Sequence, residues 1–292
     1  MTEDPRPLAV VAGGGVLPGR VAAAAAAAGR PVFVLGLEGF ADPAVIGGHD
    51  HLMMRLGAVG PAMAALRARG CRELVLAGPV KRPSIMDIRP DATGARLLAR
   101  IGRAAFGGDD GLLKAIVRVL GEEGFVVRGA HEVLRDVLAP AGLMSRAAPD
   151  AAAMADIARG IAVLLALGAA DVGQACVVQQ GLVLAVEAVE GTDAMIERAG
   201  PLARPGPGGV LVKLVKPGQE RRADLPTLGH ATIARARGAG LRGVAFEVGG
   251  TILMDRQAMI AAADEAGLFL LGIDPQQARD GAAANRGEGS AR

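Results

Sequence analysis

A charged segment in the last third of the sequence carries the chemistry that this chain is best equipped to perform. Its cations and a carboxylate are Lys213, Lys216, Arg221, Arg222 and Asp224. A strand-like stretch delivers the two lysines, a Pro-Gly turn follows, and Thr227 is placed to cap the next helix. Four cations beside a helix N-terminus can surround a diphosphate and stabilise charge that develops during phosphoryl transfer. Asp224 could then bind Mg²⁺ or orient the attacking water, and a charged surface loop is the alternative interpretation.

A glycine loop near the N-terminus is the second candidate. Gly13, Gly14 and Gly15 follow an apolar stretch and precede a helix that we expect to begin at Leu17. Glycines let the backbone approach a ligand, and the exposed N–H groups of a helix start attract phosphate. The dinucleotide pattern G-x-G-x-x-G is not met, because Pro18 occupies the place of its third glycine, which disfavours a nicotinamide-dependent oxidoreductase. A tight turn without a ligand remains the alternative.

Two polar clusters follow other strand-like runs. Gly78, Lys81 and Arg82 come after the carboxyl end of a strand, where open α/β sheets bind ligands, although a solvated loop would look the same. Gly191, Thr192 and Asp193 follow another buried strand together with acidic residues. Such a cluster could hold a hard cation or a sugar hydroxyl, and the competing explanation is that Thr192 or Asp193 caps a helix.

Composition excludes several functional classes. The chain has 32 basic and 30 acidic residues, no Trp, no Tyr and six Phe, so neither a basic surface nor aromatic platforms favour nucleic-acid binding. The four histidines form no metal-binding motif, and no G-x-S-x-G elbow occurs. Cys71 and Cys176 are far apart and are expected to be buried free thiols. Metal-assisted phosphate chemistry therefore fits better than acyl transfer.

The elements that position these residues alternate between short apolar runs and longer amphipathic ones, which predicts parallel α/β folding. We expect a Rossmann-like N-terminal domain with a parallel sheet and a C-terminal α/β domain. Strands are predicted at 8–12, 31–35, 51–56, 73–77, 125–127, 209–214, 244–247 and 268–271, with a hairpin around Gln180-Gly181. Helices are predicted at 17–28, 59–69, 92–105, 111–123, 151–167, 228–237 and 256–265.

The domain division is expected near two prolines. Residues 1–139 form the predicted N-terminal domain, 140–150 the linker, 151–275 the C-terminal domain and 276–292 a disordered polar tail. The most membrane-like stretch, 161–170, is shorter than the ~20 residues of a spanning helix. The acidic N-terminus does not resemble a signal peptide, which predicts a cytoplasmic protein.

Six segments together resemble the bacterial UDP-2,3-diacylglucosamine pyrophosphatase family that is unrelated to calcineurin-like phosphoesterases. They are AGGGVLP (12–18), AGPVKRPSIMDIRPD (77–91), GDDGLLK (108–114), EGFVVRGAHEVL (123–134), DVGQACVVQQGLVLAVEAVEGTDAM (171–195) and LVKLVKPGQERRADLPTLG (211–229). The resemblance runs in one order from about Leu8 to Gly272, and the EGTDAM and KPGQ–RR–DLPT segments are its most specific parts.

This resemblance implies Mg²⁺-dependent hydrolysis of UDP-2,3-diacylglucosamine to 2,3-diacylglucosamine 1-phosphate and UMP in lipid A biosynthesis, with the ligand held between the domains. It makes Asp224 the catalytic residue and candidate metal ligand, with Asp193 as a second possible ligand. It implies transient association with the inner-membrane surface and leaves a homodimer possible. The alternative is a protein that binds a nucleotide sugar or phospholipid precursor without cleaving it. The expected substrate-binding residues are Gly13, Gly14, Gly15, Leu17, Gly78, Lys81, Arg82, Gln174, Gly191, Thr192, Asp193, Lys213, Lys216, Gln219, Arg221 and Thr227.

Overall fold

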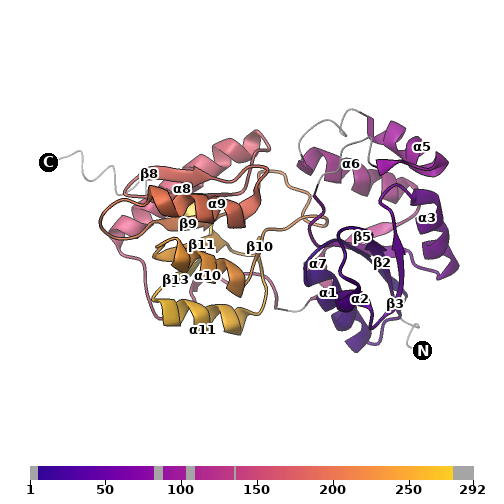
Figure 1. Ribbon diagram of the computed structural model, residues 1–292, viewed down its shortest axis with the longest axis horizontal. Coiled ribbons are helices and arrows are strands. Elements are labelled where there is room, and N and C mark those ends of the chain that lie inside the picture. The colour runs from indigo at the N-terminus through magenta and orange to yellow at the C-terminus, as the bar shows by residue number, and fades with distance from the viewer. Residues whose placement is uncertain (1–5, 82–87, 103–108, 135, 279–292) are drawn as a thin grey trace. The chain divides into compact units, whose positions relative to one another are not determined.

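A computed structural model of the chain describes residues 6–81, 88–102, 109–134 and 136–278. The chain divides into two compact units. The first contains Met1–Asp136 together with Glu220–Asp224, and the second contains Val137–Gln219 and Leu225–Arg292. Each unit has its own sheet and helices (Figure 1), so the two-domain α/β fold predicted from the sequence is confirmed.

The first unit is built on a five-stranded parallel sheet in the order β3-β2-β1-β4-β5. The chain leaves the centre of this sheet in opposite directions after β1 and after β4, which is the Rossmann-like arrangement expected from the alternating pattern. The register pairs Leu8 with Val32 on one side and with Glu73 on the other. The strands are β1 (Leu8–Ala12), β2 (Val32–Leu37), β3 (Asp50–Met54), β4 (Glu73–Ala77) and β5 (Val126–Arg128).

Helices cover both faces of this sheet. Phe33 and Leu74 lie in a core that includes Met63, Leu97 and Val119 from α3, α5 and α6, while α1 packs against β1, β2 and β4 on the other face. Because both faces of the sheet are buried, the strands are apolar at successive residues and not only at every second residue. The helices are α1 (Leu17–Ala27), α2 (Pro43–Ile46), α3 (Val59–Ala68), α5 (Ala92–Ile101), α6 (Asp109–Glu122) and α7 (Ala130–Val133).

The second unit contains a six-stranded mixed sheet in the order β6-β13-β11-β9-β7-β8. Its hairpin joins β7 and β8 through Gln180-Gly181, both with positive φ (53° and 77°), which is the I′ geometry that matches strand twist. A separate two-stranded sheet pairs β10 with β12. The strands are β6 (Gly142–Leu143), β7 (Ala175–Gln179), β8 (Leu182–Val186), β9 (Val210–Lys213), β10 (Thr227–Leu228), β11 (Gly243–Glu247), β12 (Ile252–Leu253) and β13 (Phe269–Ile273).

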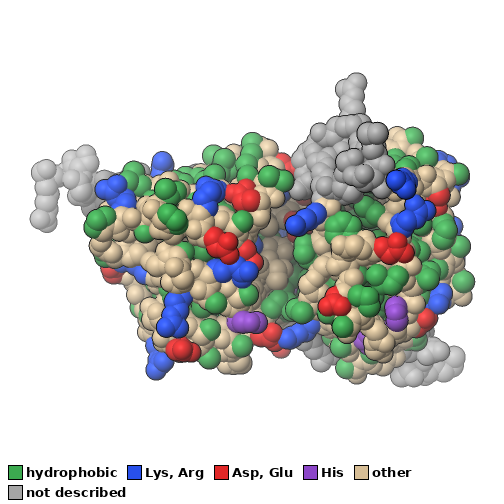
Figure 2. Space-filling view, in the orientation of Figure 1, with side chains coloured by type: hydrophobic (Ala, Val, Ile, Leu, Met, Phe, Trp, Pro, Cys, Tyr) green, Lys and Arg blue, Asp and Glu red, His purple; other side chains and the backbone are tan. Residues whose placement is uncertain are grey.

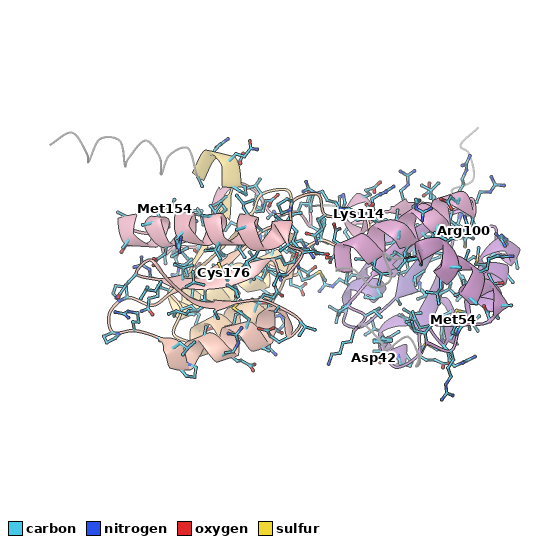
Figure 3. The ribbon with its side chains drawn as sticks, turned by 90° about the horizontal axis from the view of Figure 1, so that it is seen from above. Asp42, Met54, Arg100, Lys114, Met154 and Cys176 are labelled. Carbon is cyan, nitrogen blue, oxygen red and sulfur yellow. The ribbon has the colours of Figure 1, made fainter. Side chains whose placement is uncertain are left out.

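Helices also cover both faces of the second sheet (Figure 1). The first helix, α8, packs on one face through Ile157 and Ile161, and the other helices pack on the opposite face around Phe246 and Leu211. Figure 3 labels Cys176 on the sheet beneath α8, and its thiol lies 3.8 Å from the carbonyl oxygen of Gly160. Both cysteines are buried and free, as expected. These elements are α8 (Ala151–Ala169), α9 (Gly191–Ala199), the 3₁₀ turn η2 (Gly200–Leu202), α10 (His230–Gly238) and α11 (Arg256–Ala266).

Helix α8 is longer than the membrane-like stretch recognised in the sequence. Its 19 residues, with a mean hydropathy of 1.7, are long and apolar enough to span a membrane by length and composition alone. Within the unit, however, its buried face contacts β7 and β9 and contains Ile157, Gly160, Ile161 and Leu164. These contacts make α8 a core helix of the second unit, because the apolar face is already used to cover the sheet.

Two expectations from the sequence need correction. The segment predicted to be a linker, 140–150, belongs to the second unit, because β6 pairs antiparallel with β13 and places Leu143 opposite Leu271. Thr227 does not cap α10, since it lies in β10 and the N-cap residue is Gly229. The tail predicted to be disordered, 276–292, begins in a helical turn at 275–278, where the N–H of Ala278 donates to the carbonyl of Asp274 at 3.0 Å, and residues 279–292 lie outside the described residues.

An ion-pair cluster at the start of β4 predicts an acid-sensitive first unit. Glu73 binds Arg30 at 2.9 Å and Arg128 at 3.1 Å. Burial alone would raise the pKa of Glu73, but the hydrogen bonds from the two arginines outweigh it and hold the pKa below its usual 4.5. The stabilisation is therefore complete above pH 4.5 and is lost as the pH falls through the lower pKa of the folded state.

We expect Glu73→Gln to lower the free energy of unfolding by about 1 kcal/mol at neutral pH, because the side chain is only partly buried. The difference from wild type should shrink below pH 4.5, where Glu73 itself becomes protonated. Urea titrations across this pH range measure it. A difference that stays constant with pH would contradict the role assigned to this carboxylate.

A close contact between α8 and the sheet gives a second prediction. A Cβ atom on Gly160 would lie 2.6 Å from Cγ2 of Val212, whereas a Cβ atom on Gly238 of α10 would have no neighbour within 4 Å. Gly160→Ala should therefore destabilise the second unit by about 1–3 kcal/mol through overpacking. Gly238→Ala should instead stabilise it by up to about 1 kcal/mol through helix propensity. Denaturant unfolding of the two variants tests this, and equal effects would show that α8 does not pack this closely.

Candidate active site

The carboxyl edge of the first sheet brings two of the predicted loops together. Gly13 follows β1 and Gly78 follows β4, and these strands are neighbours at the centre of the sheet. The chain crosses over on opposite sides after β1 and after β4, so this edge is the switch point where open α/β sheets bind ligands. The predicted helix start at Leu17 is confirmed, and Gly15 enters it with φ of 74°.

The two loops approach each other more closely than side chains would permit. Gly13 N–H donates to the carbonyl of Ala77 at 2.8 Å, and Gly14 N–H donates to the carbonyl of Pro79 at 2.9 Å. A Cβ atom on Gly13 would lie 2.5 Å from the carbonyl oxygen of Gly78, so glycine is required there. Lys81 is exposed at the end of the second loop, and Arg82 lies outside the described residues.

The segment Glu220–Asp224 also belongs to the first unit, although the chain on both sides of it belongs to the second. Its backbone forms a turn in which the N–H groups of Ala223 and Asp224 both donate to the carbonyl of Glu220 at 3.0 Å. The Glu220 carboxylate binds the guanidinium of Arg222 at 2.7 and 2.8 Å. These bonds lower the pKa of Glu220, with a smaller contribution from Lys114. Asp224 is half-buried at the end of this turn.

The place of this segment within the first unit follows from its contact with α6. Glu220 N–H donates to the Asp110 carboxylate in the first turn of α6. Helix α6 leads into β5, which runs parallel to β4, so the helix begins at the carboxyl edge of the sheet. Asp224 and the two glycine loops are therefore attached to the same edge of one sheet.

A second group of predicted residues surrounds the end of β9 in the second unit. Lys213 is 5% exposed, and its Nζ donates to Oγ1 of Thr192 at 2.8 Å and to the carbonyl of Thr227 at 3.4 Å. Thr192 in turn donates to the buried carboxylate of Glu187 at 2.7 Å. This chain of a cation, a hydroxyl and a carboxylate holds Lys213 inside the unit, because a buried charge needs partners.

The KPGQ turn is fixed by its own glutamine. Oε1 of Gln219 accepts from the backbone N–H of Lys216 at 2.8 Å, and its amide nitrogen lies 3.4 Å from Oε1 of Gln174. The ammonium of Lys216 pairs with the carboxylate of Asp171. Asp171 and Glu220, which partner two of the predicted cations, were not recognised in the sequence as parts of a site. No local spacing indicates them, since Asp171 lies 45 residues before Lys216.

The acidic residues after β8 have different partners. Gly191, with φ of 82°, begins α9, and Thr192 lies in its first turn without capping it. Asp193 is exposed, and its carboxylate pairs with Arg235 of α10 at 3.4 Å. This ion pair leaves Asp193 poorly suited to a metal, whereas Glu187 is occupied by Thr192.

The described residues fit a magnesium ion that takes most of its ligands from the substrate and from water. Among the residues described, no group of three His, Cys, Asp or Glu side chains is close enough to form a complete protein site. Mg²⁺ commonly uses one or two carboxylates and completes its shell with phosphate oxygens and water. Asp224, half-buried and part of the first unit, is the carboxylate that would serve this purpose.

Surface charge outside these groups is mixed. Figure 2 shows basic and acidic side chains interspersed on the face in view, in agreement with the net charge of +2. A cation in this protein is therefore normally accompanied by an acid, as in the pairs of Arg222 with Glu220 and Lys216 with Asp171. Recognition of an anionic ligand has to come from particular positions and not from a general basic surface.

The hydroxyl between Lys213 and Glu187 gives a direct test of the second group. Thr192→Val should destabilise the unit by about 1–3 kcal/mol, because the buried Lys213 and Glu187 side chains each lose a hydrogen bond, and Thr192→Ser should restore most of the stability. Thr251→Val is the matched control: its hydroxyl is completely buried and has no hydrogen-bond partner among the described residues, so its removal should be neutral or stabilising. Denaturant titrations compare them, and equal losses would contradict the proposed network.

Comparison with known proteins identifies the family of the chain. Residues 7–137 match the family model of the LpxI N-terminal domain, and residues 140–271 match that of the LpxI C-terminal domain. The chain is 45% identical over 278 residues to the UDP-2,3-diacylglucosamine pyrophosphatase LpxI of Caulobacter vibrioides, which covers 93% of this chain and 99% of that protein. The chain therefore belongs to the LpxI family.

Proposed function

We propose that this chain hydrolyses the pyrophosphate bond of UDP-2,3-diacylglucosamine, giving UMP and 2,3-diacylglucosamine 1-phosphate on the route to lipid A. The observation that carries the proposal is the identity of 45% to a pyrophosphatase of that name across 93% of the chain. Water adds to one phosphorus, the P–O bond to the other phosphate breaks, and each product keeps one phosphate. The reaction needs no redox partner and no covalent enzyme intermediate.

The first unit offers the groups that this reaction requires. The glycine loops after β1 and β4 provide a close backbone approach for phosphate at the switch point of the sheet. Asp224 lies at the same edge, on a turn that its own backbone hydrogen bonds hold closed. It would hold Mg²⁺ or orient the attacking water, and a bound Mg²⁺ would neutralise charge that develops on the phosphate oxygens.

Lys213, Lys216 and Gln219 of the second unit are proposed to bind the substrate as well. Both lysines already have oxygen partners, in Thr192 and Asp171. A phosphate oxygen could take the place of such a partner without creating an unpaired buried charge. Asp193 stays a second possible metal ligand, and a metal there would have to displace its exposed ion pair with Arg235.

The substrate carries two acyl chains, so we propose that the protein works in the cytoplasm at the surface of the inner membrane and without inserting α8, which already packs on its own sheet. The alternative function is to bind a nucleotide sugar or phospholipid precursor without cleaving it. It would use the same glycine loops and cations. It would not depend on Asp224, and this difference separates the two functions.

Release of UMP from UDP-2,3-diacylglucosamine, measured with Mg²⁺ and with EDTA, tests the proposal. Asp224→Ala should lower kcat by about 10²–10⁴-fold, as expected when a residue that handles a metal or a proton is removed. Substrate affinity should persist or increase, because a negative charge near the phosphates has been removed. Lys213→Ala and Arg221→Ala should mainly raise KM.

Arg237→Ala is the matched control for the loss of a cation. Arg237 is exposed on α10 and lies 3.7 Å from Glu265, so its removal changes net charge without touching the predicted site. Its kinetic constants should equal those of wild type. Tight substrate binding without UMP release from the wild-type protein would favour the binding function instead, and normal turnover by Asp224→Ala would exclude the assigned mechanism.

A further inference from the structure

The turn that carries Asp224 is joined to the first unit by contacts and not by chain continuity. The chain enters the first unit at Glu220 and leaves it after Asp224, while Gln219 and Leu225 belong to the second unit. A segment this short has no core of its own. Its position relative to the sheet edge must therefore come from specific bonds to residues of α6 and its surroundings.

One bond that fixes it comes from Asp110. Its Oδ1 accepts from the backbone N–H of Glu220 at 2.7 Å, across 110 positions of sequence. Its Oδ2 pairs with Lys114 at 2.6 Å, one turn further along α6. Figure 3 labels Lys114 on this helix. Asp110 is only 8% exposed, although it lies in the first helical turn, where the helix dipole favours a carboxylate.

The bond at Glu220 determines where Asp224 lies because the turn between them is closed. Both Ala223 and Asp224 donate their N–H groups to the carbonyl of Glu220. Arg222 binds the Glu220 side chain and also experiences the charge of Glu132 after β5. A shift of Glu220 would therefore move the Asp224 backbone with it.

We propose that Asp110 is a positioning residue for Asp224: its carboxylate anchors the Glu220–Asp224 turn to the sheet edge of the first unit. This assignment rests on the proposed hydrolysis, because it acts through the aspartate of that reaction. Asp110 itself handles no proton and no metal in this role. An acceptor oxygen at the position of Oδ1 is what the turn requires, whereas the negative charge is not required.

Steady-state kinetics of UMP release separate these requirements. Asp110→Ala should lower kcat by about 10- to 100-fold, the loss expected when a reacting group shifts by about 1 Å, and should change KM less. Asp110→Asn should recover most of kcat, because its amide oxygen can still accept from Glu220. Lys114→Gln should remain near wild type, since the partly exposed pair contributes little.

A double variant tests whether Asp110 acts through Asp224. Asp110→Ala added to Asp224→Ala should change the residual rate by less than about 3-fold. The effects of two substitutions are not additive when one residue acts through the other. Hydrogen exchange should show faster exchange of the 220–224 amides in Asp110→Ala, with the α6 amides still protected. This measurement does not require activity, so it reports on the anchor even if wild type releases no UMP, a result that would contradict the proposed function.

Asp156→Ala is the matched control for loss of a buried anchoring aspartate. Asp156 is 4% exposed, and its oxygens accept from the backbone N–H groups of Gln180 and Gly181 at 3.1 and 2.7 Å. It thus holds a turn as Asp110 does, at the hairpin of the second unit, and its loss should lower stability but leave kcat unchanged. The proposal is overturned if Asp156→Ala lowers kcat as much as Asp110→Ala, if Asp110→Asn is as slow as Asp110→Ala, or if exchange at 220–224 is unchanged.

Discussion

A hydrogen bond from the backbone of Glu220 to the carboxylate of Asp110 joins two parts of the first unit that lie 110 residues apart in sequence. The first unit has a complete parallel sheet from residues before 137, yet it includes five residues from beyond 219. Apolar burial cannot hold a segment of glutamate, arginine and aspartate. Buried hydrogen bonds and ion pairs must therefore do so, and they are directional enough to fix the position of a single carboxylate.

The charges near both groups of candidate residues obey a second constraint, which is that a buried or half-buried ion requires a partner. Lys213 uses Thr192 and Thr227, and Lys216 uses Asp171, while the exposed Arg222 also pairs with Glu220. Without a ligand these partners prevent a cluster of unpaired cations. With an anionic ligand they can be exchanged, so the ligand has to compete with protein oxygens. Such competition favours a diphosphate with several oxygens over a weaker anion.

Much of the fold could be predicted because the strands of a sheet covered on both faces are continuously apolar. The strands at 8–12 and 73–77 were predicted with their exact bounds, and the hairpin was located by Gln180-Gly181. The prediction of a linker at 140–150 was wrong because β6, with two residues, is too short to show any periodicity in the sequence. Pro140 and Pro149, which flank it, are also typical of a linker. Thr227 was misassigned as a cap because a threonine before an amphipathic stretch suits a short strand equally well.

The candidate site was predictable only where local sequence reflects local geometry. A glycine loop after a strand is such a case, since Gly13 and Gly78 are required by a backbone contact between adjacent strands. The groups that pair with the lysines could not be predicted in this way, because Asp171 and Glu187 come near them only in the tertiary fold. The place of Asp224 in the first unit could not be predicted either. It depends on Asp110, which in the sequence looks like an ordinary residue at the start of a helix.

The two kinds of group proposed to bind phosphate have different physical consequences. The glycine loops after β1 and β4 are uncharged and rigid, because the N–H groups of Gly13 and Gly14 are bonded to the carbonyls of Ala77 and Pro79. The backbone of these loops cannot be altered by substitution of a side chain without disturbing the strands. The lysines and Arg221 are charged, and each can be replaced by substitution of its side chain, although Lys213 and Lys216 are held by partners within the second unit. In the proposed mechanism, binding is spread over both kinds and tolerates the loss of one cation, whereas the chemical step depends on one carboxylate at the end of an anchored turn. Catalysis should therefore be more sensitive than binding to small movements of Glu220–Asp224, because a misplaced carboxylate loses its alignment with the phosphorus while diffuse attraction to the phosphates persists.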